Sequence, residues 1–168
     1  LIDKRTEKNP FVNSRTYQEF SRPDFAGGSG RSLDFIAEIS EFARLGGVPF
    51  VDGGTGLVVG YGHAPEELPF VRELFQLRIV HGVDFIQERV ERARKFLEQK
   101  GLSQHDFPLH AADMNHMKDD IQDDSIDLLV AVNVTIDERD DIEGFAKEIL
   151  RVLSPGGVAL LGMPYGQS

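Results

Sequence analysis

The sequence predicts an α/β fold with a doubly wound, mostly parallel sheet, and two patterns carry that prediction. Short apolar runs alternate with stretches of helical periodicity at the spacing of βαβ units. One of these runs, IDLLVAV at 126–132, is almost continuously apolar, as a strand buried on both faces of a parallel sheet requires. Ligands of such sheets bind beyond the carboxyl ends of the strands, so we expect a functional site there.

The expected elements follow in order along the chain. Residues 1–31 are polar and are predicted to form an N-terminal arm or lid, and residues 32–168 to form the α/β domain. A first helix is expected from Ser32, whose hydroxyl would cap it, to Gly46-Gly47. Later helices, with apolar residues three and four apart, are expected from Pro65, from Ile86 to Gly101, and from Ile142 to a Ser-Pro-Gly-Gly turn at 154–157. Strands are expected at Leu57–Gly60, Arg78–Val83, Phe107–Ala111, Ile126–Val132 and Val158–Gly162.

Composition and charge exclude several classes of protein. With 168 residues the chain is long enough for one domain with a sizeable core. Its formal net charge of −10 argues against nucleic acid as a partner, because phosphate binding requires basic surface. No apolar stretch approaches a membrane span of about 20 residues, and the charged first residues are not a signal peptide. We therefore expect no membrane partner and a cytoplasmic location. The lack of cysteine excludes disulfides and thiolate metal sites.

Three features directly follow predicted strands and are expected at one edge of the sheet. Gly60-Tyr61-Gly62 follows the first strand, Asp84 the second and Asp113 the third. Glycines there let a ligand approach the backbone, and a carboxylate after the second strand can accept hydrogen bonds from a ribose diol. The third carboxylate can accept one from an exocyclic amino group such as that of adenine. The set suits an adenosine-containing ligand.

These residues also have structural alternatives. Asp84 can cap the helix that follows it, and Met114 can belong to the core rather than pack against an adenine. The residues His110, Asp113 and His116 lie close together in sequence. Their spacing is not a recognised zinc pattern, so no metal site is predicted.

Five segments, taken in order, resemble the class I S-adenosylmethionine-dependent methyltransferases: LVVGYGHAPEE, IVHGVDFIQERVERARKF, HAADMNHM, DDSIDLLVAVNV and EGFAKEILRVLSPGGVALL. The last segment is typical of the small-molecule branch of that family. The resemblance implies S-adenosylmethionine as the cofactor and a small molecule as the methyl acceptor. The cofactor-binding residues that it implies are Gly60, Tyr61, Gly62, Asp84, Phe85, Asp113, Met114 and Asn133. It identifies no catalytic residue, because a methyl group on a sulfonium is already activated and the protein mainly aligns the acceptor.

Two glycine clusters compete for the role of cofactor loop. The stretch DGGTG at 52–56 matches the family's acid-x-Gly-x-Gly pattern residue by residue. If it were the cofactor loop, however, the apolar LVVGY that follows would belong to no predicted strand or helix. The cluster at 60–62 has a predicted strand before it and a helix after it, and Asp84 follows at the family's spacing, so this cluster is favoured. Val58 then stands where the family usually has an acid that holds the methionine part of the cofactor, unless Asp52 supplies that charge. Ala64 stands in place of the third glycine.

A second departure from the family lies at the carboxyl end. The family's sheet continues with an antiparallel hairpin, whereas this chain ends at GMPYGQS, so we expect a sheet that lacks the last two strands. An exposed apolar edge would favour a homodimer or a missing segment.

The leading functional hypothesis is S-adenosylmethionine-dependent methyl transfer to a small-molecule acceptor. The alternative, motivated by Val58 and the abbreviated sheet, is a non-catalytic methyltransferase-like domain that acts in assembly or dimerisation. A nicotinamide-dependent Rossmann enzyme is disfavoured, because the full Gly-x-Gly-x-x-Gly pattern is missing.

Overall fold

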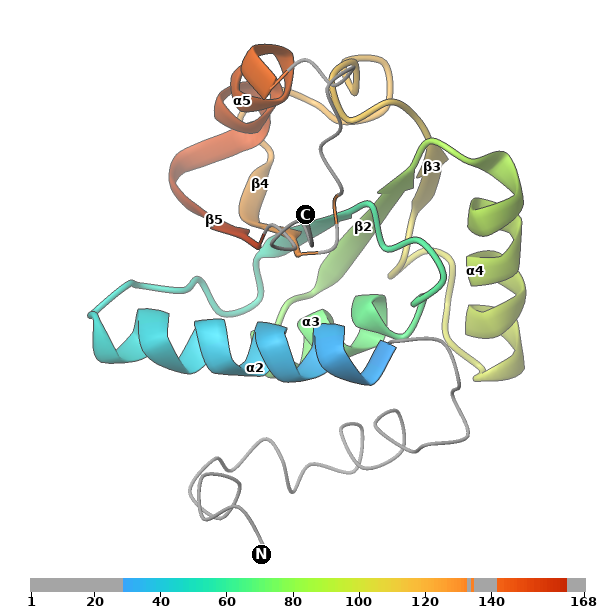
Figure 1. Cartoon of the computed structure of the whole chain (residues 1–168), viewed down its shortest axis with the longest axis horizontal. Coiled ribbons are helices and arrows are strands. Elements are labelled where there is room, and N and C mark those ends of the chain that lie inside the picture. Colours follow the sequence, from blue (N-terminus) through green and yellow to red (C-terminus); the bar gives the residue numbers. More distant parts are fainter. Residues whose placement is uncertain (1–28, 133, 135–141, 163–168) are drawn as a thin grey trace, which may run out of the picture.

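The computed structural model describes residues 29–132, 134 and 142–162, which form an α/β domain (Figure 1). Its elements in chain order are α2 (Ser29–Leu45), β1 (Thr55–Val59), α3 (Glu67–Leu74), β2 (Ile79–Asp84), α4 (Gln87–Gln99), β3 (Leu109–Ala111), β4 (Ile126–Ala131), α5 (Ile142–Val152) and β5 (Leu153–Leu161). The five strands form one sheet in the order β3-β2-β1-β4-β5, and every neighbouring pair is parallel. The predicted doubly wound fold is confirmed.

The sheet is covered on both faces because its strands alternate side chains between two apolar clusters. On one face, Val58 of β1 packs in a cluster with residues of α2, α3 and α4. On the other face, its neighbours Leu57 and Val59 pack in a cluster with α5 and with Met117 and Ile121 of the β3–β4 loop. Figure 1 shows α2 and α3 on one side of the sheet and α5 on the other. Because the strands are parallel, the carboxyl ends of β1, β2 and β3 lie together at one edge of the sheet.

The first helix begins earlier than predicted. Residues 29–31, which we assigned to the arm, form the first turn of α2, and the rest of the arm lies outside the described residues. Ser32 is therefore inside the helix, where it is 4% exposed, and the prediction that it caps the helix is wrong. The buried face of α2 explains the longer helix, because Leu33, Ile36 and Ala37 have helical spacing and all lie in the core.

The third strand is shorter than predicted. It spans Leu109–Ala111, and Phe107 precedes it as a buried core residue. The backbone oxygens of Asp106 and Pro108 still accept hydrogen bonds from β2, but Pro108 has no N–H to donate in return.

The predicted turn at 154–157 is an irregularity within β5. Leu153 pairs with Ile126 of β4, and the next paired residue is Val158, opposite Leu128, so the Ser-Pro-Gly-Gly segment bulges out of the ladder. Of the described helices, none has the length and apolar character needed to cross a membrane.

Candidate functional site

The glycine loop at 60–62 directly follows β1. Gly60 has φ +68° and Gly62 has φ +57°, a conformation that side chains with a Cβ rarely adopt. The Gly60 N–H donates to the Val83 oxygen of β2 at 2.8 Å, so the loop leaves the sheet at the end of the ladder. A Cβ on Gly62 would meet no atom closer than 3.9 Å, so there is space beside this part of the backbone. The choice of this cluster as the loop that ends the first strand is confirmed.

The earlier cluster at 52–56 leads into β1 from the opposite end. Gly53 has φ +72°, and its N–H donates to the Gln76 oxygen in the turn after α3. Asp52 is separated from Gly60 by the length of β1, which rises about 3.3 Å per residue. Asp52 therefore cannot supply a charge beside the glycine loop.

Asp84, the last residue of β2, joins this loop to the start of α4. Its side chain is 1% exposed. Oδ2 accepts the Gly62 N–H at 3.0 Å, and Oδ1 accepts the Ile86 N–H at 3.0 Å. The carboxylate thus closes the turn that leads into α4 and also holds the glycine loop.

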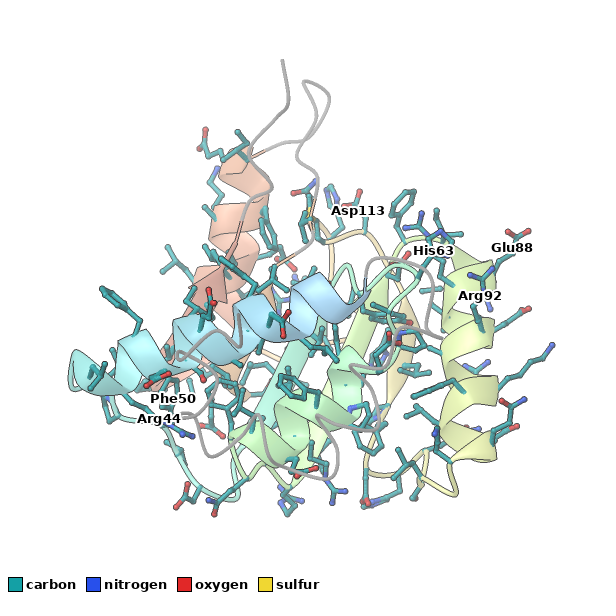
Figure 2. The ribbon with its side chains drawn as sticks, turned by 60° about the horizontal axis from the view of Figure 1, so that its bottom comes forward. Arg44, Phe50, His63, Glu88, Arg92 and Asp113 are labelled. Atoms are coloured by element: carbon teal, nitrogen blue, oxygen red, sulfur yellow. The ribbon has the colours of Figure 1, made fainter. Side chains whose placement is uncertain are left out.

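Two arginines of α4 reach toward the loop. Arg89 Nη1 lies 3.7 Å from Asp84 Oδ2, and the Arg89 side chain is 29% exposed. Arg92 Nη1 lies 2.6 Å from Nδ1 of His63, an exposed residue of the glycine loop. Figure 2 shows His63 and Arg92 toward the same end of the molecule as Asp113, with Arg44 and Phe50 at the opposite end. Positive charge therefore lies beside the Asp84 carboxylate.

Asp113 lies at the neighbouring strand end. The Ala112 N–H donates to the Asp84 backbone oxygen at 3.1 Å, which brings the segment after β3 beside the end of β2. The Asp113 side chain is 58% exposed, and its Oδ1 accepts the Asn115 N–H at 2.8 Å. The Asp113 carboxylate is thus accessible at the edge of the sheet while it also closes a local turn.

The two apolar side chains next to these acids differ in exposure. Phe85 is 72% exposed, a large value for an aromatic ring beside a buried carboxylate. Met114 is partly buried and packs against the cluster that contains α5, so its core role is supported. Phe85 therefore presents free apolar surface at this edge of the sheet.

The structure gives Tyr61 and Val58 core positions. The Tyr61 ring is 1% exposed within the α2–α3–α4 cluster, and burial, followed by the charge of Asp84, raises the pKa of its phenol. Its hydroxyl has no hydrogen-bond partner among the residues that the structure describes. Val58 is 1% exposed in the same cluster. Asn133, the remaining predicted site residue, lies outside the described residues.

Sequence reasoning missed two buried acids behind the loop. Glu66 and Glu67 are 2% and 1% exposed at the start of α3. From the sequence we placed them only in the first turn of the helix that Pro65 begins. The available signal was their position, because they stand between the glycine loop and the apolar stripe of α3.

The histidines near β3 are arranged differently from the sequence cluster. His110 Nε2 lies 3.1 Å from His81 Nδ1 on β2, and His110 Nδ1 lies 3.3 Å from an Asp120 oxygen. His116 instead lies beside Asp113, with Nδ1 3.7 Å from Oδ2. Across the described ranges, no group of three or more histidines and acids could hold a metal ion.

The fold and the glycine loop define a Rossmann-like domain of the class I methyltransferase type. Residues 57–161 match the family described as "Methyltransferase domain", and the chain belongs to this family. Over 79 residues it is 39% identical to the sterol 24-C-methyltransferase erg6 of Aspergillus fumigatus, a match that covers 47% of this chain and 20% of that protein.

Solved structures share the fold. A SAM-dependent methyltransferase from Aquifex aeolicus has a TM-score of 0.56 and 20% identity, over 94% of this chain and 71% of that chain. A geranyl diphosphate C-methyltransferase from Streptomyces coelicolor, in complex with S-adenosyl-L-homocysteine, has a TM-score of 0.60 and 14% identity, over 74% and 42%. The [4+2]-cyclase SpnF has a TM-score of 0.60 and 26% identity, over 78% and 43%. The chain thus spans a minor part of the sterol enzyme and less than half of two of these structures.

Proposed function

We propose that this protein binds S-adenosylmethionine at the carboxyl ends of β1, β2 and β3 and transfers its methyl group to a small-molecule acceptor. The observation that carries the proposal is the hydrogen bond from the Gly62 N–H to the buried Asp84 carboxylate. It joins an open glycine loop to an acid at the neighbouring strand end, within a chain of the methyltransferase-domain family.

The residues present fit an adenosine-containing cofactor. Each Asp84 oxygen accepts one backbone N–H, and a carboxylate oxygen offers about two acceptor sites, so one site on each oxygen remains for a ribose hydroxyl. Arg89, which lies over Oδ2 with a partly exposed side chain, would shift aside. The exposed Asp113 carboxylate would accept a hydrogen bond from the adenine amino group, and Phe85 would cover one face of the base.

The bound cofactor supplies a methyl group that is already activated on its sulfonium sulfur. The remaining task of the protein is to hold that group in line with the acceptor and to exclude water. Gly62 would allow close approach of the backbone to the cofactor, and Asp84 would fix its ribose. Asn133 stays a predicted contact.

Val58 stands where the family usually has an acid, so another residue would have to supply that negative charge. Glu66 and Glu67 are the buried acids that directly follow the glycine loop. We propose that one of them interacts with the ammonium group of the methionine part. A buried carboxylate beside a cation gains more from the interaction than an exposed one, because water screens it less.

The proposal that the methyl acceptor is a small molecule is supported by the names of two similar proteins. The Aspergillus fumigatus relative is a sterol methyltransferase and one structural neighbour is a geranyl diphosphate methyltransferase. Both names describe methylation of a small molecule, which supports the same acceptor class here.

The alternative function is a methyltransferase-like domain without methyl transfer. Val58 in place of the acid supports it, and so does the likeness to SpnF, which is described as a cyclase. Isothermal titration with S-adenosylmethionine tests the cofactor site on which our proposal depends. Micromolar binding that is lost in Asp84→Asn supports our proposal, and no binding by the folded protein would refute it.

A further inference from the structure

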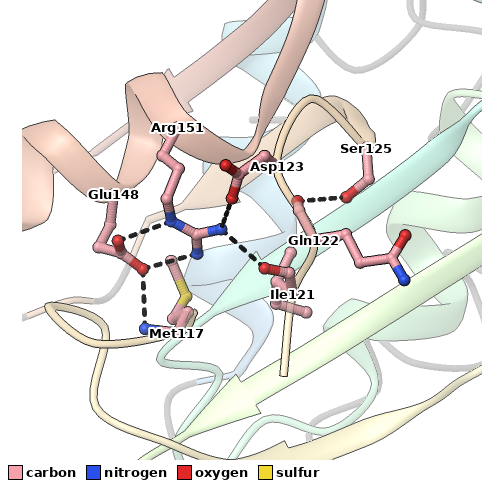
Figure 3. Close-up of polar contacts among 7 residues, drawn as sticks. All are labelled: Met117, Ile121, Gln122, Asp123, Ser125, Glu148 and Arg151. Carbon is pink, nitrogen blue, oxygen red and sulfur yellow. Dashed lines mark hydrogen bonds and ion pairs between the residues drawn. The ribbon is translucent and has the colours of Figure 1, made fainter. Parts of the chain in front are cut away.

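Glu148 and Arg151 of α5 form a clamp on the loop between β3 and β4 (Figure 3). The Glu148 carboxylate accepts the Met117 N–H at 2.8 Å. Arg151 donates to both Glu148 oxygens, from Nε and Nη2, at 2.8 Å each. Arg151 Nη1 donates to the Ile121 backbone oxygen at 2.8 Å and to Asp123 Oδ1 at 2.6 Å. Two side chains of one helix thus bind the loop at three successive places.

The clamp is largely shielded from solvent. The Glu148 and Arg151 side chains are 12% and 17% exposed. Met117 and Ile121 are 0% and 2% exposed, and both pack in the cluster that α5 forms with the sheet. A bidentate arginine–carboxylate pair in such surroundings fixes orientation more strongly than an exposed ion pair.

The clamped loop carries the residues expected to contact the base. Asp113 begins a turn that is closed by a hydrogen bond from the His116 N–H to the Asp113 backbone oxygen at 2.9 Å. Met117 is the next residue and is held by Glu148. The Glu148 carboxylate therefore holds Met117, the residue that directly follows the turn from Asp113 to His116.

We infer that Glu148, oriented by Arg151, is a positioning residue that sets the preference of this protein for adenine over bases without its exocyclic amino group. The inference rests on the proposed S-adenosylmethionine site. Glu148 has no role in contact with the cofactor. It acts through Met117 on Asp113, so loss of the clamp removes recognition of the amino group and leaves the ribose contact at Asp84 in place.

The test compares the affinities of the full chain for S-adenosylhomocysteine and S-inosylhomocysteine, which carries oxygen in place of that amino group. The wild-type protein should bind the adenine compound at least about tenfold more tightly, since the inosine compound loses the charge-assisted hydrogen bond from the amino group and places a carbonyl oxygen toward the Asp113 carboxylate. Glu148→Ala should reduce this ratio to below about threefold by weakening the adenine compound alone. Glu148→Gln, which retains an oxygen for the Met117 N–H, should keep more of the preference than Glu148→Ala.

A variant on the same helix provides the control. Glu143 forms an exposed ion pair with Lys147 at 2.7 Å, within α5 itself, so Glu143→Ala should keep the wild-type ratio. A folded Glu148→Ala that keeps the wild-type ratio overturns the inference, and so does a wild-type protein that binds both compounds equally. A wild-type protein that binds neither compound instead refutes the proposed cofactor site. If Glu148→Ala does not fold, Arg151→Lys is judged by the same ratio, and an unchanged ratio in that variant again overturns the inference.

Discussion

The N–H of Gly62 donates to the Asp84 carboxylate at 3.0 Å and so ties the glycine loop to the end of β2, 22 residues later. The same carboxylate receives the Ile86 N–H. These two bonds give Asp84 a structural role, and experiment can separate that role from the proposed contact with the ribose.

Asp84→Asn should weaken S-adenosylhomocysteine binding at least about tenfold and lower the free energy of unfolding by about 1–2 kcal/mol, because the amide loses the charge and one acceptor. Calorimetry and urea unfolding measure the two effects. Asp127 is a matched control, since its carboxylate accepts the Thr55 N–H and the Ser154 hydroxyl, each at 2.8 Å, near the opposite edge of the sheet. Asp127→Asn should lose similar stability and keep ligand binding; equal losses of binding in both variants would contradict the site.

Gly60→Ala should destabilise the protein more than Gly53→Ala. Both glycines have positive φ, at +68° and +72°, so each substitution carries a backbone cost of about 1 kcal/mol. Only the new Cβ at residue 60 would lie 2.8 Å from Val134 Cγ2, whereas the one at residue 53 would meet no atom within 4 Å. Urea unfolding should therefore give a larger loss for Gly60→Ala, together with weaker ligand binding. A smaller loss than in Gly53→Ala would show that the loop adjusts freely.

Phe85→Ala should weaken S-adenosylhomocysteine binding about fivefold and leave stability nearly unchanged, because the ring is exposed in the absence of a ligand and would stack on the base. Fluorescence-monitored unfolding and calorimetry test both parts. Phe42 on α2, 79% exposed against 72% for Phe85, provides the control, since Phe42→Ala should change neither quantity. Unaltered binding by Phe85→Ala would remove this residue from the site.

Glu66→Gln or Glu67→Gln should weaken S-adenosylhomocysteine binding at least about tenfold and leave 5′-methylthioadenosine binding nearly unchanged. Only the first ligand carries the amino acid ammonium that these buried acids are proposed to pair with. Glu73→Gln, an exposed position of the same helix, should affect neither ligand. If the ratio of the affinities for the two ligands is the same in all three variants, neither Glu66 nor Glu67 supplies the charge that is missing at Val58. That result would favour the non-catalytic alternative.

His81 should make the protein less stable in acid. Burial, followed by the neighbouring His110, lowers the pKa of His81 from 6.5 to about 4. Between these pH values the unfolded chain binds more protons than the folded one, so the stability is complete above pH 6.5 and falls as the pH drops toward 4. His81→Phe should show a smaller loss of unfolding free energy between about pH 7 and about pH 5 than the wild type. His105→Phe, at a site where the side chain is 83% exposed, should keep the wild-type slope, and a wild-type slope in His81→Phe would contradict the assignment.

The order of strands and helices was predictable because each element carries a local signal. The run from Leu57 to Val59 alternates between the two faces of the sheet, and Gly60 can adopt the left-handed backbone that the turn requires. The same local reasoning failed at Ser32, where the buried face of α2 extended the helix beyond the expected cap.

The site was predictable only in part. The sequence by itself determined the fold class, the family, the loop at Gly60 and Gly62 and the acids at two strand ends, because these depend on residue type and on spacing along the chain. Only the tertiary structure showed that the Tyr61 ring lies in the core, that Arg89 lies over Asp84 and that Arg151 orients Glu148 toward the β3–β4 loop. Those relationships join residues from separate elements. They depend on how the helices pack on the sheet, and no local pattern encodes that packing.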